Sequence, residues 1–331
     1  MSSASPSPAL PSTRPRTVLA PEDWRARARA HRERIARRTD PLVALRMRGE
    51  KHPVQDFLFG YYTHSPAALQ RWHSGAGVVL ADDDGTAAVA EAAELGTAPR
   101  GEWRHWRRVE AGEVPGVVLE GREVGGWAVD VPAFLADRTS GAAFTRELLA
   151  RTAERAPRLG CFGLHEWAMA YRADENGVRH ENAALRLGAS GTDAVVEGHR
   201  IRCSHFDAFR FFQPQAVARN ELQPMREAQR TMEQPGCLHA SMDLYKWAYK
   251  LLPAVDSELL ADCFELAWDV RVTDMEASPY DLADWGYEPV RIETTEGKAE
   301  YVRRQRAFAA RGTALRQRLV TATDRILAAA A

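Results

Sequence analysis

One segment of the chain, residues 235–253 with the sequence PGCLHASMDLYKWAYKLLP, constrains the fold more than any other. Proline is disfavoured inside a helix, so this mainly apolar stretch is expected to form a helix that ends before Pro253. With 3.6 residues per turn, four ionisable residues fall on one narrow face, which we call the polar strip: His239, Asp243, Lys246 and Lys250. Such a helix borders either a hydrated cavity or the protein surface, and the sequence leaves both alternatives open.

The composition suits a soluble globular protein. The chain has 331 residues, of which 45% are hydrophobic and 27% charged, enough for one large or two modest domains with a sizeable core. No run approaches the roughly 18 consecutive apolar residues of a membrane span, so no membrane partner is expected. The four cysteines are far apart in sequence and show no CxxC spacing, which favours a reducing cytoplasm over a disulfide framework.

The sequence predicts a tail and two further regions. Residues 1–16 are rich in Ser and Pro and lack the apolar centre of a secretory signal, so a disordered tail is expected. Residues 17–131 combine helices with a strand-rich segment, and residues 132–331 should form a mainly helical core that contains the site. Because strands and helices do not alternate regularly, the predicted class is α+β, mostly helical with a small sheet or strand-rich insertion, rather than a doubly wound sheet.

Individual elements follow from hydrophobic periodicity and capping signals. Long or medium helices are expected at residues 21–38, 52–63, 132–155, 159–172, 226–233, 236–252, 256–276 and 295–330. Short helices are expected to begin at Ser65 and Ser278, each followed by proline at the first helical position. Strand-like pieces lie between residues 75 and 131 and again between residues 179 and 213.

Two ionisable residues, His165 and Glu166, interrupt the apolar block LGCFGLHEWAMAY. A buried charge needs a partner, a ligand or access to water. One interpretation is a core histidine bonded to a backbone carbonyl beside a glutamate at a surface edge. The other is a pair of site residues.

A second block, CSHFDAFRFF, places His205, Asp207 and Arg210 among phenylalanines. Asp207 and Arg210 are three residues apart and pair on a helix, whereas His205 and Asp207 share a face only on a strand. An aspartate and an arginine in aromatic surroundings either orient a planar or anionic ligand or form a buried ion pair that fixes the fold. The sequence favours neither alternative.

The expected helix at residues 256–276 carries its own acidic row, made of Asp262, Glu265 and Asp269. Such a row is commonly a solvated face. If it instead packs against the polar strip, two helices present complementary charges to one cavity, which would then be a candidate active site.

These groups permit general acid and base chemistry, with lysines to neutralise a phosphate or carboxylate on the substrate. His239 and Asp243 also have the i, i+4 spacing of metal ligands, but HExxH, Walker A, dinucleotide-binding and GxSxG motifs are missing. The candidate catalytic residues are His165, Glu166, His205, Asp207, His239 and Asp243. The candidate substrate-binding residues are Lys246, Lys250, Arg210, Phe209, Tyr245 and Trp247.

Arginines are concentrated in the first expected helix. Seven of them stand between Arg25 and Arg38 against the single acidic residue Glu33. The pattern fits a solvated helix face or a surface that contacts phosphates. In the second case the DNA contacts are assigned to Arg25, Arg27, Arg29 and Arg32.

Four blocks, GCFGLHEWAMAYR, RCSHFDAFRFF, EQPGCLHASMDLYKWAYKL and ASPYDL, resemble a group of actinobacterial proteins commonly labelled 3-methyladenine DNA glycosylase. The resemblance extends over nearly the whole chain beyond the tail and assigns no catalytic residue. It implies hydrolysis of the N-glycosidic bond of an alkylated base in DNA repair, without a cofactor, with the extruded base held in an aromatic pocket beside a carboxylate. The residues that fit those parts are Asp207, Asp243 or Glu166 as carboxylate and Phe206, Phe209, Tyr245 and Trp247 as stacking surfaces.

The residues alone favour a different enzyme, a cytoplasmic one that acts on a small metabolite through a His/Asp/Glu pocket, with or without a divalent metal. A third alternative is a ligand-binding module whose carboxylates are all held in salt bridges. The glycosylase hypothesis predicts a basic groove beside the polar strip, and the metabolite enzyme predicts a closed pocket lined by the histidines and carboxylates. The binding module predicts the same pocket with every carboxylate in a salt bridge.

Overall fold

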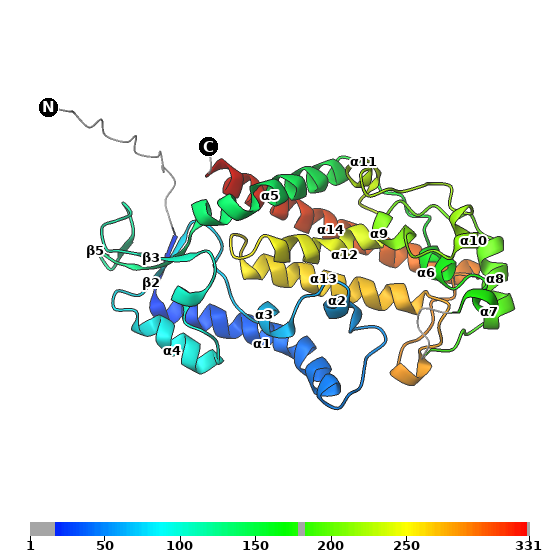
Figure 1. Cartoon of the computed structure of the whole chain (residues 1–331), viewed down its shortest axis with the longest axis horizontal. Coiled ribbons are helices and arrows are strands. Elements are labelled where there is room, and N and C mark those ends of the chain that lie inside the picture. Colours follow the sequence, from blue (N-terminus) through cyan, green and yellow to red (C-terminus); the bar gives the residue numbers. More distant parts are fainter. Residues whose placement is uncertain (1–16, 178–182, 330–331) are drawn as a thin grey trace. The chain divides into compact units, whose positions relative to one another are not determined.

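The computed structural model describes residues 17–177 and 183–329, and the predicted tail at residues 1–16 lies outside them. The fold is mostly helical with a small sheet, which confirms the predicted α+β class (Figure 1). The chain divides into two compact units: a smaller one with residues 17–27 and 76–130, and a larger one with residues 28–75 and 131–329. The predicted region 17–131 is therefore shared between the two units.

The smaller unit contains the strands expected between residues 75 and 131. Its four-stranded sheet has the order β1 (Thr17–Leu19), β2 (Val78–Ala81), β6 (Gly126–Val129) and β3 (Trp106–Val109), with β1 parallel to β2 and the other pairs antiparallel. A separate hairpin joins β4 (Val118–Leu119) to β5 (Arg122–Glu123). The unit also contains η1 (Arg100–Glu102) and α4 (Thr86–Leu95), an alanine-rich helix that the predictions missed despite its high helix propensity.

The first helix, α1 (Pro21–Met47), runs well past the predicted end at residue 38 and includes Pro41. The aromatic segment at residues 52–63 was predicted as a helix, but only α2 (Phe57–Gly60) is helical and the rest forms turns. The short helix α3 (Pro66–Leu69) begins as predicted, because the Ser65 hydroxyl accepts a hydrogen bond from the Ala68 amide.

The larger unit is built on four long helices, α5 (Val131–Ala153), α12 (Leu238–Lys250), α13 (Ser257–Glu276) and α14 (Thr295–Ala328). Helix α12 packs against both α13 and α14, and α14 also packs against α5 (Figure 1). All four helices were predicted to within a few residues. Asp256 caps α13 as expected, since its carboxylate accepts a hydrogen bond from the Leu259 amide at 2.7 Å.

Shorter helices cover one end of these four helices. They are α6 (Leu164–Met169), α7 (Ala173–Asn176), α8 (Gly188–Glu197), α9 (Phe206–Phe209), α10 (Pro214–Val217), α11 (Gln229–Met232) and η2 (Ala283–Trp285). The predicted helices at residues 159–172 and 226–233 are thus each reduced to a short core. No helix among the described residues is both long enough and apolar enough to span a membrane.

The strand-like pieces predicted between residues 179 and 213 form no regular strand where the structure describes them. They lie on either side of α8 and make only two isolated β-bridges, Leu185 with Tyr280 and Ile201 with Asn220. The apolar alternation at Ile201 and Cys203 reflects burial in a loop, and the side chain of Asn220 bonds to the Cys203 backbone as a neighbouring strand would. The helix predicted to begin at Ser278 is also wrong: the Ser278 hydroxyl accepts a bond from the Tyr280 amide within a turn.

Candidate functional site

The polar strip of α12 borders the protein interior, not bulk solvent, over its first two members. His239 is 7% exposed and Asp243 is 1% exposed. Lys246 is mostly covered and Lys250, one turn later, is exposed. The strip therefore runs from the core of the larger unit to its surface.

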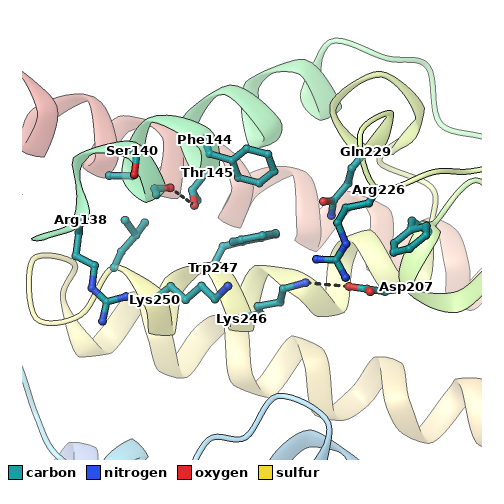
Figure 2. A pocket seen from close by; sticks show the side chains of 14 residues that line it. Arg138, Ser140, Phe144, Thr145, Asp207, Arg226, Gln229, Lys246, Trp247 and Lys250 are labelled. Atoms are coloured by element: carbon teal, nitrogen blue, oxygen red, sulfur yellow. Dashed lines mark hydrogen bonds and ion pairs between the residues drawn. The ribbon is translucent and has the colours of Figure 1, made fainter. Parts of the chain in front are cut away.

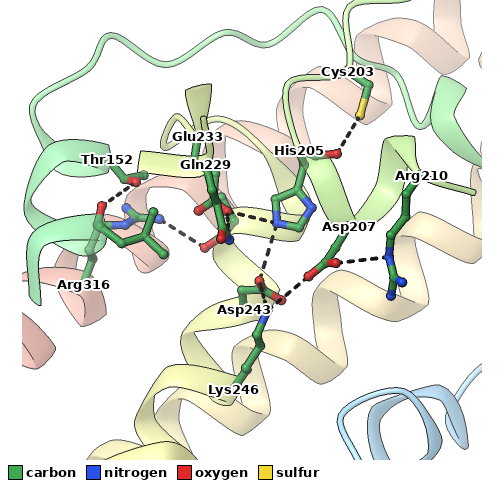
Figure 3. Close-up of polar contacts among 12 residues, drawn as sticks. Thr152, Cys203, His205, Asp207, Arg210, Gln229, Glu233, Asp243, Lys246 and Arg316 are labelled. Carbon is green, nitrogen blue, oxygen red and sulfur yellow. Dashed lines mark hydrogen bonds and ion pairs between the residues drawn. The ribbon is translucent and has the colours of Figure 1, made fainter. Parts of the chain in front are cut away.

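Asp243 is held by three neighbours, of which Figure 3 shows His205 and Lys246. The Tyr62 hydroxyl donates a hydrogen bond to Oδ1 at 2.7 Å, and the Lys246 ammonium donates to Oδ2 at 2.9 Å. His205 Nε2 lies 3.5 Å from the same Oδ2. Burial by itself would raise the pKa of Asp243, but the positive charge of Lys246, with the contacts from His205 and Tyr62, holds that pKa well below its usual value.

Lys246 joins this interior carboxylate to a second one. Its ammonium also donates to Asp207 Oδ2 at 3.2 Å, and the other oxygen of Asp207 lies 3.1 Å from Nε of Arg210. Arg210 in turn donates to the Tyr61 hydroxyl at 3.3 Å. Burial lowers the pKa of Lys246, but the two carboxylates more than offset this and raise it above its usual value, so the ammonium stays charged.

Behind Asp243 lies a group that we call the His205 triad: His205, Glu233 and Asp243. The donor atoms of these three buried residues all lie within 4.8 Å of one another. His205 Nε2 is 3.4 Å from Glu233 Oε1, which also accepts a 2.6 Å hydrogen bond from Gln229. Burial raises the pKa of Glu233, and although burial lowers that of His205, the adjacent carboxylates raise it overall.

A second group, the His165 triad, consists of His165, His239 and Asp274, with donor atoms again within 4.8 Å of one another. His165 Nε2 lies 3.0 Å from Asp274 Oδ1, and the rings of His165 and His239 meet edge to face at 4.5 Å. Burial and the neighbouring His165 hold the pKa of His239 well below its usual value. The His239 ring also lies 5.3 Å from that of His205, so the polar strip connects the two triads.

A cavity of about 510 Å³ opens beside the outer end of the polar strip, between α5, α9, α12 and the segment leading into α11 (Figure 2). Four cations, one carboxylate and three aromatic rings line it: Arg138, Arg226, Lys246, Lys250, Asp207, Phe144, Phe206 and Trp247. Lys246 and Lys250 both lie over the Trp247 ring, at 4.6 and 5.1 Å from its centroid. The pocket is thus cationic and partly apolar, and two of its lining residues, Lys246 and Gln229, touch the His205 triad.

The acidic row of α13 pairs with arginines of α1 and α14, so the alternative in which it packs against the polar strip is not realised. Arg34 of α1 binds Asp262 at 2.7 Å and Glu265 at 2.7 Å, and Arg311 of α14 binds Asp269 at 2.8 Å. These arginines neutralise the carboxylates, and the row serves to join helices within the larger unit.

The arginines of α1 differ in whether they pair with carboxylates. Arg25, one of the proposed DNA contacts, pairs with Glu94 at 2.9 Å in the smaller unit, and Arg34 is engaged by α13. Arg27 is exposed, and Arg29 and Arg32 are half-buried.

The structure brings most, but not all, of the predicted site residues together. His165, His205, His239, Asp207, Asp243 and Lys246 form one continuous polar network, and Lys250 and Trp247 line the pocket beside it. Glu166 pairs instead with the buried Arg271 at 3.0 Å. Tyr245 lies in the core against Tyr62 and Phe264, and Phe209 packs on Phe212.

Sequence reasoning missed several partners of the site. Arg271 and Asp274 had a usable signal: they stand seven residues after Phe264 and Ala267, so they continue an apolar face of α13 with charged groups. Tyr62 and Glu233 fall within the helices predicted at residues 52–63 and 226–233, but in the structure they stand in irregular backbone just after α2 and α11, so the predicted helices did not show what these side chains contact.

Comparison with known proteins adds no relative: no protein-family model, no curated protein and no solved structure matches this chain.

The buried position of Asp243 predicts unequal effects for two neighbouring lysines. Lys246→Met removes the cation from a buried carboxylate, and we expect the free energy of unfolding to fall by about 3–5 kcal/mol. Lys250→Met is the matched control, because Lys250 contacts the same Trp247 ring but is exposed, and it should cost less than about 1 kcal/mol. Urea denaturation followed by far-ultraviolet circular dichroism measures both, and equal losses would show that Lys246 does not stabilise Asp243.

Proposed function

We propose that this chain is a cytoplasmic enzyme that acts on a small anionic metabolite bound in the 510 Å³ pocket. The observation that carries the proposal is the contact chain from the pocket to the interior. Asp207 lines the pocket, Lys246 bridges it to Asp243, and His205 lies behind. A cavity of this size with a few convergent ionisable groups, some with strongly shifted pKa values, is the usual form of a small-molecule site. The four cysteines, all unpaired, agree with a reducing cytoplasm.

The lining of the pocket indicates an anionic substrate with an apolar part. Four cations face one carboxylate there, and Lys246 already shares its charge between Asp207 and Asp243. Arg138, Arg226 and Lys250 therefore remain to hold a phosphate or carboxylate. Phe144 and Phe206 supply apolar surface for the rest of the molecule.

Within this proposal Asp207 is the general base, since it is the carboxylate on the pocket wall. Asp243 is a positioning residue: it fixes Lys246, which in turn orients Asp207. His205 and Glu233 lie behind Asp243 and influence its charge, but neither residue lines the pocket. Mutation of Asp243 should therefore act on the rate through the orientation of Asp207.

Anion binding gives a test that needs no knowledge of the substrate. Inorganic phosphate should bind in the pocket, and Lys250→Gln should weaken it about tenfold, because one charge-assisted hydrogen bond of about 1.5 kcal/mol is lost. Arg146→Gln is the control: Arg146 lies on the same helix as Arg138, pairs with Asp324 and does not line the pocket. Isothermal titration calorimetry measures both affinities. Absence of phosphate binding, or equal weakening in both variants, would contradict an anion site.

A DNA glycosylase is the second candidate, proposed from the resemblance. Its structural support is the presence of Asp207, Phe206 and Trp247 in one cationic pocket, where a carboxylate would assist cleavage of an N-glycosidic bond beside an extruded base. In this case the exposed Arg27 of α1 would contact the phosphate backbone.

An excision assay separates the two candidates. If the glycosylase proposal holds, the purified protein releases 3-methyladenine from methylated duplex DNA, and Asp207→Asn slows release at least about a hundredfold because the carboxylate charge is lost. Asp324→Asn, which alters an exposed ion pair on α14, should leave release unchanged. Phosphate binding without any base release would favour the small-metabolite enzyme.

A further inference from the structure

We propose that His165, His239 and Asp274 bind a divalent first-row transition metal ion in the interior of the larger unit. The proposal goes beyond the pocket and its substrate, and it does not depend on either. It rests on the donor atoms of the His165 triad, on their spacing, and on the charges around them.

The first observation is a set of buried polar atoms that lack hydrogen-bond partners. Asp274 is fully buried, yet neither of its carboxylate oxygens has a hydrogen-bond partner among the described residues, and the same holds for His165 Nε2. The 3.0 Å between His165 Nε2 and Asp274 Oδ1 is close enough for a hydrogen bond, but the groups are not aligned for one. A buried carboxylate with two unpartnered oxygens is costly unless something else binds it.

The second observation is the spacing of the donors. Ligands at about 2.0–2.1 Å from a tetrahedral metal ion lie about 3.3 Å from one another. The 3.0 Å between His165 Nε2 and Asp274 Oδ1 is close to this value, and all three donors fall within 4.8 Å. The edge-to-face arrangement of the two histidine rings brings nitrogens from different helices, α6 and α12, toward the carboxylate on α13. Small side-chain rotations close such a set around an ion.

The third observation concerns charge. Asp274 and Glu166 share one guanidinium, that of Arg271, at 3.6 and 3.0 Å. One negative charge is therefore left without a full counterpart in a buried place, unless a histidine is protonated or a cation binds. A divalent ion would supply that charge, and two imidazoles with one carboxylate suit zinc or iron(II), with coordination positions left for water or substrate.

The neighbours of the triad have the form of a supporting layer. Cys161 Sγ lies 3.7 Å from His165 Nδ1, the nitrogen opposite the proposed ligand atom, and thereby orients the ring. In the same way, Arg271 orients the carboxylate of Asp274. The His205 triad is the weaker candidate, because Tyr62 and Lys246 occupy the oxygens of Asp243 and Gln229 occupies Glu233.

The test is metal binding by the full-length protein. After removal of metal with a chelator, Zn²⁺ should bind with one ion per chain, and Co²⁺ should give visible d–d absorption with histidine and carboxylate ligands. Asp274→Asn and His165→Asn should each weaken Zn²⁺ binding at least about a hundredfold, more than the loss of a supporting group would. His64→Asn, at a buried histidine outside both triads, is the control and should bind as the wild type does.

Other results would overturn the proposal. One is that the wild-type protein binds neither Zn²⁺ nor Co²⁺ stoichiometrically. The other is that binding survives Asp274→Asn but is lost in His205→Asn, which would place the ion in the His205 triad. If the variants fail to fold, the wild type decides: Zn²⁺ must raise its melting temperature and Co²⁺ must give the histidine-type spectrum. If folded wild-type protein shows no rise in melting temperature with Zn²⁺, or no such spectrum with Co²⁺, the His165 triad is an ion pair and not a metal site. Phosphate binding in the pocket is measured separately, so the two proposals fail independently.

Discussion

The ammonium of Lys246 is the interaction on which the rest of the site depends. It lies between two carboxylates, one buried and one on the wall of the pocket, and it is the cation in direct contact with Asp243. An ionised carboxylate in the core is costly by several kcal/mol unless it is paired and hydrogen-bonded, and Asp243 has both an ammonium and a hydroxyl partner. Because Lys246 is four-fifths or more covered yet reaches the pocket, the charge of the interior network is connected to the wall of the pocket.

The helix packing explains why this connection exists. Helix α12 lies against α13 and α14, and its polar strip meets short helices and loops. Those segments supply His165, His205 and Glu233. The outcome is a division of the strip: His239 and Asp243 belong to the interior triads, whereas Lys246 and Lys250 belong to the pocket.

Much of this arrangement was readable from the sequence, because long helices and their caps leave strong local signals. The polar strip, the N-cap at Asp256 and the four long helices follow from periodicity and proline placement. Partners that come from irregular segments could not be predicted in the same way. Tyr62 and Glu233 lie at the ends of predicted helices that are mostly irregular in the structure, and Arg138 looks like any exposed arginine of α5. The acidic row of α13 shows the opposite failure, since its spacing was read correctly but the sequence does not say that Arg34 and Arg311 would meet it.

The central claim, that Lys246 is held between two carboxylates while Lys250 is not, has a direct test in amine reactivity. The chain contains four lysines, Lys51, Lys246, Lys250 and Lys298, so labelling by an amine reagent at trace level is resolved residue by residue in mass spectrometry. Burial lowers the pKa of Lys250, and Lys246 lowers it further, whereas Asp243 and Asp207 raise the pKa of Lys246. Since only the neutral amine reacts, we predict that Lys250 is labelled at least about ten times faster than Lys246 in the native protein and that the two rates converge in denaturant. Equal labelling rates in the native protein would contradict the account.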